Sequence, residues 1–204
     1  MLDASAARGP LPALVEASVF AGVDWVQVRE RALEGSALLS LCDRVSEAAR
    51  RAASRRGGFV RVLVNRRVDV ALAAGADGVH LGGDAMAPAD ARALLGASAW
   101  IGVSTHAPDE IDANSGASYA HLAPVFAPLS KESSRPPLGL AALARATERG
   151  LPVLAQGGIT PERARDVVAA GAAGVAVTGS VLAADDPAAA VRALRRALDE
   201  ATRG

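Results

Sequence analysis

The sequence predicts an α/β fold, a (β/α)8 TIM barrel whose first strand is truncated or missing. Half of the 204 residues are hydrophobic but only 3% are aromatic, a composition typical of a parallel sheet covered by Ala-rich helices. Short apolar runs alternate with helix-like stretches along the chain. A glycine followed within a few residues by an apolar run also occurs four times, as GVDWV, GADGV, GASYA and GAAGV.

The repeated glycines Gly22, Gly75, Gly116 and Gly171 stand where one helix ends and the next strand begins. Helices commonly end in a left-handed residue, which favours glycine. Strict alternation with short connections implies parallel strands. No GxGxxG follows an early strand, so a dinucleotide-binding fold is less well supported than a barrel. A barrel carries its functional residues at the C-terminal ends of the strands.

Apolar runs with strand-like alternation predict the strands of this barrel. They lie at 24–31, 59–65, 78–82, 100–104, 119–126, 152–156 and 174–178. In the first of them, alternation places Trp25, Gln27 and Arg29 on one face, with the intervening residues on the other.

Helical spacing of apolar residues, with Pro or small polar residues at the starts, predicts the covering helices. They lie at 11–22, 36–55, 68–74, 88–95, 107–115, 139–149, 161–170 and 187–202. Ser36 is the expected N-cap of the second helix.

The N-terminal segment leaves the barrel one strand short. Nothing before Leu11 can supply a full strand, and residues 1–3 match only its last piece. Such a barrel exposes a sheet edge on each side of the gap. Two explanations remain open, a true start that lies upstream or irregular closure by residues 1–10. We expect one domain over residues 1–204, and open edges favour a homo-oligomer.

The charge balance favours a small-molecule partner. Lys and Arg together number 22, as do Asp and Glu, so no net field attracts nucleic acid or an acidic membrane. The single Cys42 cannot form an internal disulfide, which fits a reducing compartment. No signal-peptide pattern and no apolar run of membrane-spanning length is present. We therefore expect a cytoplasmic protein that binds neither nucleic acid nor membranes.

Two glycine turns indicate a phosphate site. Gly157 and Gly158 follow the sixth apolar run, and Thr178, Gly179 and Ser180 follow the seventh. Backbone N–H groups at two neighbouring strand ends form a cradle for phosphate. The alternative is that the turns need glycine for their geometry alone.

Other polar residues fall at the predicted strand ends. Arg66 is equally well explained as a solvated loop charge, and His80 as a histidine satisfied within the core. His106 lies on a rim loop, and Ser130-Lys131 lies in a long polar loop of the kind that often carries function. The full set is Gln27, Arg29, Arg31, Asn65, Arg66, His80, Asp84, Ser104, His106, Ser130, Lys131 and Gln156.

From about Leu11 onward the chain resembles the superfamily of thiamine phosphate synthase and its paralogue, the TenI thiazole tautomerase. The resemblance rests on QVRER, VNRRVDVALAAGADGVHLG, IGVSTH, PVF with SK, QGGIT and GVAVTGS, in this order. It implies a (β/α)8 barrel that holds a thiazole phosphate or thiamine phosphate on the last two glycine turns. It implies catalytic roles for Arg29, Arg31, His106 and Lys131. It implies ligand binding by Gln27, Asn65, Ser104, Ser130, Gln156, Gly157, Gly158, Thr178, Gly179 and Ser180.

The synthase joins the thiazole to a hydroxymethylpyrimidine pyrophosphate and uses Mg²⁺ on the departing pyrophosphate. The family pattern has a carboxylate after the strand-end Asn, where this chain has Arg66, and a second one where it has Ala85. Asp84 is the weak remaining candidate for a metal ligand, since one carboxylate makes a poor Mg²⁺ site. Arg31 replaces the usual Lys, as in the TenI branch. These departures favour a TenI-like protein without a metal.

The TenI pattern itself has a His where this chain has Pro124, so either His106 or His80 shuttles the proton or the reaction is a different one. An active synthase that needs Mg²⁺ remains one alternative. A non-catalytic, ligand-binding paralogue is the other.

Overall fold

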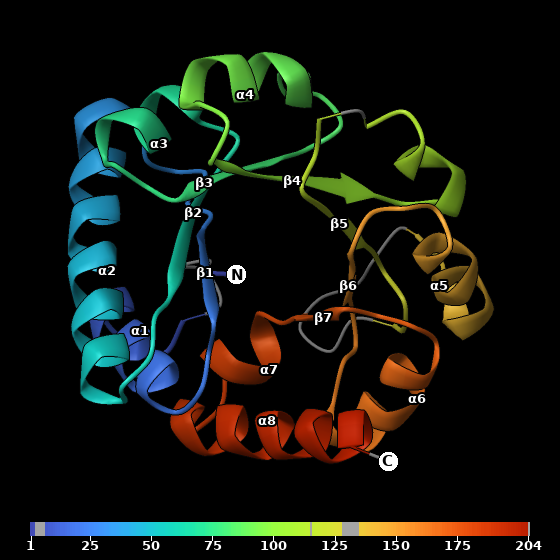
Figure 1. Cartoon of the computed structure of the whole chain (residues 1–204). Helices are drawn as coiled ribbons and strands as arrows, with labels where there is room; N and C mark the ends of the chain where they lie inside the picture. Colours follow the sequence, from blue (N-terminus) through green and yellow to red (C-terminus); the bar gives the residue numbers. More distant parts are fainter. Residues whose placement is uncertain (3–6, 115, 128–134, 204) are drawn as a thin grey trace.

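The computed structural model of the chain describes residues 1–2, 7–114, 116–127 and 135–203. Seven strands form one sheet in which each strand is hydrogen-bonded to the next in chain order, and all the pairings are parallel. The sheet curls into a ring with the helices outside (Figure 1). The strands are β1 (Trp25–Val28), β2 (Arg61–Asn65), β3 (Gly78–Leu81), β4 (Trp100–Thr105), β5 (Tyr119–Leu122), β6 (Val153–Gln156) and β7 (Gly174–Ala176).

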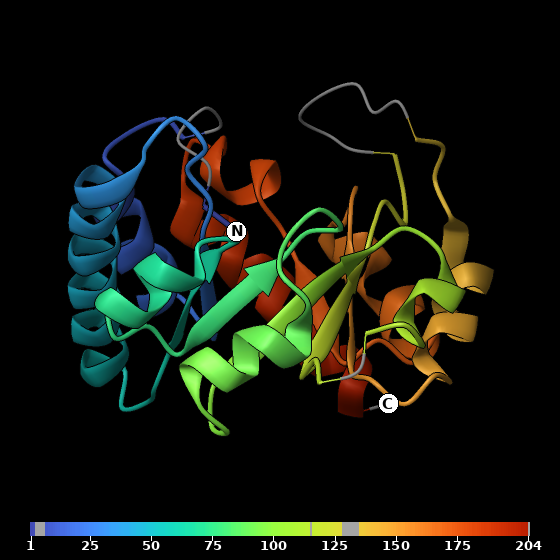
Figure 2. The same ribbon diagram turned by 90° about the horizontal axis from the view of Figure 1, so that it is seen from above.

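The helices fall between the strands, as the alternation predicted. Figure 2 shows α2 and α5 on opposite sides of the ring. The α-helices are α1 (Leu11–Phe20), α2 (Gly35–Arg55), α3 (Val68–Ala73), α4 (Pro88–Leu95), α5 (Gly139–Thr147), α6 (Ala164–Ala169), α7 (Gly179–Leu182) and α8 (Pro187–Arg203), and the 3-10 turns are η2 (Pro108–Ile111) and η3 (Pro161–Arg163).

The core lies between the outer face of the sheet and the helices. Val26 and Val28 of β1 are buried there, on the face opposite to Trp25 and Gln27, because successive strand residues point to opposite sides. Helix α2 adds a buried stripe that includes Leu41 and Val45. The repeated Val, Leu and Ala of the sequence therefore fill one continuous layer around the ring.

Two aromatic side chains and one guanidinium fill the barrel at the N-terminal ends of its strands. Trp25 and Trp100 meet edge to face with their centroids 4.9 Å apart, and the Arg61 guanidinium lies 4.2 Å from the centroid of Trp100. Edge-to-face and cation–π contacts of this kind stabilise buried clusters. Because these side chains fill the N-terminal end, a ligand would reach the barrel interior from the C-terminal ends of the strands.

The gap between β1 and β7 is closed at its C-terminal end by the first two residues. Leu2 pairs in parallel with Val28, and its N–H donates to Gln27 O at 2.7 Å. The Met1 amino group donates to Val177 O at 2.9 Å, directly after β7. This dipeptide therefore touches both free edges, as expected for the last piece of a strand and for irregular closure.

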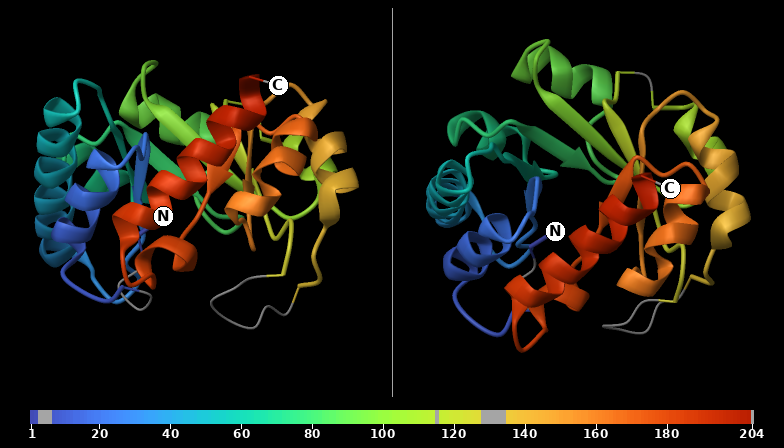
Figure 3. Two further views of the ribbon diagram at one scale, coloured as in Figure 1. Left: turned by 90° about the horizontal axis from the view of Figure 1, so that it is seen from below. Right: turned by 60° about the horizontal axis from the view of Figure 1, so that its bottom comes forward.

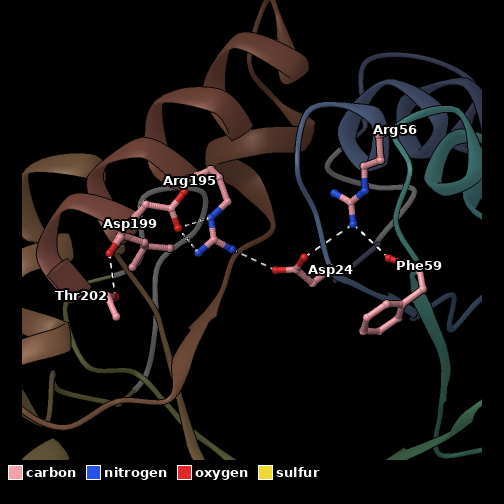
Figure 4. A network of polar contacts seen from close by, with 7 residues as sticks. Asp24, Arg56, Phe59, Arg195, Asp199 and Thr202 are labelled. Atoms are coloured by element: carbon pink, nitrogen blue, oxygen red, sulfur yellow. Dashed lines mark hydrogen bonds and ion pairs between the residues drawn. The ribbon is translucent and has the colours of Figure 1, made fainter.

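The N-terminal end of the same gap is closed by an ion pair. Arg195 of α8 donates to Asp24 at 2.9 Å, and Asp24 also lies 3.5 Å from Arg56 (Figure 4). Helix α8 contacts α1 and α6 and runs across the gap (Figure 3). We call the gap with these two closures the seam, defined by Leu2, Asp24, Val177 and Arg195.

A cavity of about 360 Å³ lies behind the seam, between Leu2 and the ion pair. It reaches from the interior of the ring, at Gln27 and His121, to helices α1 and α8. Neither glycine turn lines it. Because the described residues supply seven strands and a dipeptide, this volume has no eighth strand to fill it.

The structure corrects several local predictions. Ser36 is not the N-cap of α2, because the helix begins earlier and Glu34 holds that position. Only one 3-10 turn, η2, forms within 107–115. The strand that starts at Tyr119 ends at Leu122, shortly before the cis Ala123–Pro124 bond. Helix α7, directly after Thr178, was not predicted.

Candidate functional site

The two glycine turns lie side by side at the C-terminal ends of β6 and β7. The strands pair through Gln156 and Ala176, so the segments that follow them emerge together. No described residue accepts a hydrogen bond from the N–H groups of Gly157, Gly158, Gly179 or Ser180. Gly158 is buried, and the other three are partly exposed. Backbone N–H groups without a protein acceptor are what an anion needs.

The first turn also requires glycine for steric reasons. Gly157 and Gly158 have φ values of 96° and 61°, in the region that favours glycine. A Cβ on Gly157 would lie 2.8 Å from Pro124 Cβ, and one on Gly158 would lie 2.8 Å from Phe126 Cβ. Close approach of the Pro124–Phe126 backbone therefore explains these glycines without a ligand. The unpaired N–H groups are the separate observation that points to an anion.

Arg163 stands beside this turn and was not among the predicted site residues. Its Nη1 donates to Gly158 O at 2.5 Å, and its guanidinium lies 4.5 Å from the Phe126 ring centroid. The side chain thus holds the turn and brings a positive charge to it. The sequence did not indicate Arg163 as a site residue, because it lies beyond the end of the strand, within η3.

Polar side chains also lie in the barrel interior, between the Trp25–Trp100 pair and the C-terminal rim. His80 Nδ1 lies 3.1 Å from the Tyr119 hydroxyl, and His80 Nε2 lies 2.9 Å from Ser104 Oγ. The rings of His80 and His121 stack with their centroids 4.2 Å apart. Burial lowers the pKa values of both histidines, and a weaker hydrogen bond that His121 donates to the Gln156 side chain opposes this at His121. Tyr119 and His121 were missed because both read as part of a continuous buried strand.

His80 is therefore a satisfied core histidine, as the sequence favoured. Burial lowers its pKa to about 3, and both of its ring nitrogens already have partners. The neutral form of the imidazole is therefore favoured at neutral pH. Ser104, in contrast, is partly exposed at the end of β4.

Gln27 lies on β1, and Arg29 and Arg31 follow in the segment directly after the strand, toward the rim. The Gln27 side chain is 5% exposed, and neither of its amide atoms has a hydrogen-bond partner among the described residues. A buried amide without hydrogen-bond partners costs free energy of folding. The amide of Gln27 is therefore a candidate to form hydrogen bonds with polar atoms of a ligand. The Arg29 side chain is half-buried and that of Arg31 is exposed.

Asn65, Arg66 and Asp84 lie together on the neighbouring part of the rim. Asn65 donates from its side chain to His80 O at 3.2 Å. Arg66 has a φ of 65° and forms an ion pair with Asp84. This hydrogen bond is the main cause of the lowered pKa of Asp84, and Arg31 adds a weaker attraction. Arg66 is thus a paired rim cation, and Asp84 is already occupied by it.

The residues that could hold Mg²⁺ do not fit that ion. The described residues contain no group of three or more His, Cys, Asp and Glu side chains placed to bind a metal. Mg²⁺ needs an octahedral set of oxygens, usually with more than one carboxylate. Here one carboxylate, Asp84, faces a guanidinium at the position where a second would be required.

His106 lies at the end of β4, next to the segment that carries Pro124. Its Nδ1 is 2.6 Å from Ala123 O, and its backbone N–H donates to Glu110 at 2.7 Å. A carbonyl can only accept, so Nδ1 carries a proton, and in the neutral imidazole Nε2 is then the acceptor. The imidazole is partly exposed and offers a base at the rim. Ser130 and Lys131 lie outside the described residues.

A parallel barrel with polar side chains at the C-terminal strand ends has the architecture of enzymes that act on small molecules. Comparison with known proteins narrows this class. The family described as thiamine monophosphate synthase matches residues 2–181, and the chain belongs to that family. In the part of the chain that the structure covers, no helix is both long and apolar enough to span a membrane.

Individual relatives agree with this family. The chain is 45% identical over 195 residues to the thiamine biosynthesis bifunctional protein ThiM/ThiE of Symbiobacterium thermophilum, with 94% of the chain but only 39% of that longer protein covered. It is 40% identical over 197 residues to a thiamine-phosphate synthase of Chloroflexus aurantiacus, with 95% and 88% covered.

A solved structure is similar over almost the whole chain. The thiamine phosphate pyrophosphorylase of Pyrococcus furiosus superposes with a TM-score of 0.81 at 27% identity, covering 98% of this chain and 94% of that one. The predicted superfamily and the predicted barrel are thereby confirmed.

Proposed function

We propose that the protein binds a thiazole phosphate or thiamine phosphate, with the phosphate on the two glycine turns. The observation that carries this proposal is the group of N–H groups at Gly157, Gly158, Gly179 and Ser180, for which the described residues supply no acceptor. Arg163 adds a positive charge beside them. Ser130 and Lys131 are proposed ligand contacts on the strength of the family resemblance alone.

The interior polar groups would receive the rest of the ligand. Gln27 has two unpartnered amide atoms, and Ser104 and Gln156 are partly exposed at the ends of their strands. Arg29 and Arg31 follow β1, which lies across the seam from β7, and would face an anionic or electron-rich part of the ligand. The neutral ring and the phosphate tail of a thiazole phosphate match this division.

Binding of thiamine phosphate, measured by isothermal titration calorimetry, tests the proposal. Gly179→Asp should abolish binding, because it adds a negative charge and bulk at the cradle. Gly9→Asp is the matched control, since it adds the same charge at an exposed position with nothing within 4 Å of the new Cβ. Absence of binding to the wild type at millimolar ligand, or retained affinity in Gly179→Asp, would contradict the site.

For the reaction we favour a TenI-like isomerisation with His106 as the group that moves the proton. Tautomerisation needs one group that takes a proton from one position of the ring and returns it at another. His106 presents a free Nε2, while its Nδ1–H is held by Ala123 O. That carbonyl directly precedes Pro124, where the TenI pattern has its own His, so an imidazole reaches the same part of the rim from the adjacent strand.

Active thiamine phosphate synthesis is the second candidate, and the 40% identity to a named synthase supports it. It predicts Mg²⁺-dependent formation of thiamine phosphate from hydroxymethylpyrimidine pyrophosphate and thiazole phosphate, with loss of activity in Asp84→Ala. The isomerase predicts turnover of the thiazole tautomer without Mg²⁺ and loss of that activity in His106→Asn. Binding without turnover in either assay would favour a non-catalytic paralogue.

A further inference from the structure

A row of three polar side chains runs from the barrel interior to the rim. Tyr119 is 1% exposed and His80 is equally buried, while Ser104 at the other end is partly exposed. The row is joined by two contacts, 3.1 Å from the Tyr119 hydroxyl to His80 Nδ1 and 2.9 Å from His80 Nε2 to Ser104 Oγ. The imidazole thus connects a buried phenol to a hydroxyl that a ligand can reach.

Packing fixes the imidazole in this row. The Tyr119 hydroxyl and His80 Nδ1 lie against the backbone of Gly102, where an added Cβ would be 2.5 Å from His80 Nδ1. On its other side the His80 ring stacks against His121 with a 4.2 Å centroid separation. These contacts hold His80 Nδ1 beside the Tyr119 hydroxyl and Nε2 beside Ser104 Oγ.

Burial determines the protonation states of His80 and Tyr119 at neutral pH. Burial lowers the pKa of His80 to about 3 and raises that of Tyr119, so at neutral pH the imidazole is neutral and the phenol keeps its proton. A neutral imidazole carries one N–H, on either Nδ1 or Nε2. The row therefore has two possible hydrogen-bond directions.

Only one direction satisfies Tyr119. The phenol must donate its proton, and His80 Nδ1 is its sole hydrogen-bond partner among the described residues. If Nδ1 carried the proton, the buried O–H would have no acceptor, which is costly. Nδ1 is therefore the acceptor, and Nε2–H donates to Ser104 Oγ. The hydroxyl proton of Ser104, which no described residue accepts, is then directed to the ligand.

We propose that Tyr119, acting through His80, fixes Ser104 as a hydrogen-bond donor that selects an acceptor atom of the ligand. The role toward a ligand rests on the proposed function, whereas the direction of the row does not. An anionic oxygen or an unprotonated ring nitrogen fits such a donor, and an amino or ammonium group at that position does not. Tyr119 and His80 are positioning residues, since neither touches the ligand.

The first test is the tautomer of His80 in the ligand-free protein. We expect ¹⁵N NMR of histidine-labelled protein at neutral pH to show Nδ1 as the unprotonated nitrogen and Nε2 as the protonated one. His106→Asn and His121→Asn identify the signals by elimination. A protonated Nδ1 in the wild type would overturn the proposal.

The second test is a double-mutant cycle on thiamine phosphate affinity. Tyr119→Phe keeps the ring but removes the donor, so His80 can adopt the other tautomer. We expect a loss of about threefold to tenfold. In a Ser104→Ala background the same change should have no further effect. Equal losses in both backgrounds would show that Tyr119 does not act through Ser104.

Thr105→Val is the matched control. It removes another buried hydroxyl hydrogen bond, from Thr105 to His121 O at 2.9 Å, but on the outer face of the same strand. It should leave the His80 tautomer and the ligand affinity unchanged. If the wild type fails to bind thiamine phosphate, the proposed function is wrong, while the NMR result still decides the direction of the row.

Discussion

The guanidinium of Arg66 pairs with the carboxylate of Asp84 at the mouth of the barrel. Arg66 adopts a left-handed φ of 65° to make this contact, a backbone conformation that ordinary residues rarely take. The pair stands where the family pattern has carboxylates. A cation therefore occupies the position that would otherwise bring a second negative charge to Mg²⁺.

Arg66→Asp is expected to create Mg²⁺ affinity that the wild type lacks. The change removes the partner of Asp84 and adds a second carboxylate next to it, and Asp tolerates a left-handed φ better than most residues. Titration calorimetry with MgCl₂ measures the effect. Arg66→Ala frees Asp84 without adding a carboxylate and serves as the control. Equal Mg²⁺ binding by all three proteins would show that Arg66 does not control the site.

Arg195→Ala is expected to lower the free energy of unfolding by about 1 kcal/mol. Its partner Asp24 is 59% exposed and Arg195 itself 38% exposed, so solvent screens the pair and the effect stays modest. A double-mutant cycle with Asp24→Asn in urea unfolding isolates the pair. Raised salt should shrink the coupling. A coupling that is zero at low salt would mean that packing of α8 alone closes this end of the seam.

Gly102→Ala is expected to destabilise the protein by about 3 kcal/mol or to prevent folding. The added methyl group would collide with the Tyr119 ring and with His80, two buried side chains that cannot move aside. Thermal unfolding followed by circular dichroism measures the loss. Gly83→Ala provides the control, because nothing lies within 4 Å of its Cβ position. Similar unfolding temperatures for the two variants would contradict the packing described for His80.

Acid should destabilise the protein through His80 and His121. The ordinary pKa of 6.5 applies to the unfolded chain, while burial lowers that of His80 to about 3 and that of His121 well below the ordinary value. Between these values the unfolded state binds more protons than the folded state. The free energy of unfolding then falls as pH decreases below 6.5, by about 1.4 kcal/mol per pH unit for each histidine.

Urea unfolding over a series of neutral to acidic pH values measures this slope. His121→Asn should reduce the slope by the share of one histidine, whatever it does to stability at neutral pH. His106→Asn removes a partly exposed histidine and serves as the comparison. An unchanged slope in His121→Asn would mean that His121 is protonated in the folded state.

The sequence predicted the structural features that depend on residues close together in the chain, such as helix ends and helix–strand alternation. The glycines that end the helices, such as Gly22 and Gly171, have positive φ values of 124° and 87°, and helix–strand alternation followed from them. The strand that starts at Tyr119 was predicted too long, because its apolar pattern continues past Leu122, where the strand ends.

Contacts between residues far apart in the chain could not be predicted from the sequence pattern. Tyr119 and His80 are separated by 39 residues, and each side chain alone fits an ordinary buried strand. Arg66 and Asp84 form their pair only because β2 and β3 end at the same rim. The glycine turns were found because glycine is rare at strand ends unless the backbone requires it, whereas Arg163 carried no such signal.

The contacts that close the seam are expected to form after the strands have paired. The contacts that close it join residues 176 apart at Met1 and Val177 and 171 apart at Asp24 and Arg195. Each β-strand pair, in contrast, joins neighbours in the chain and can form as soon as both strands exist. Bringing such distant segments together costs the most loop entropy. During synthesis the sheet can curl progressively from β1 to β7, but the Asp24–Arg195 end of the seam stays open until α8 has left the ribosome.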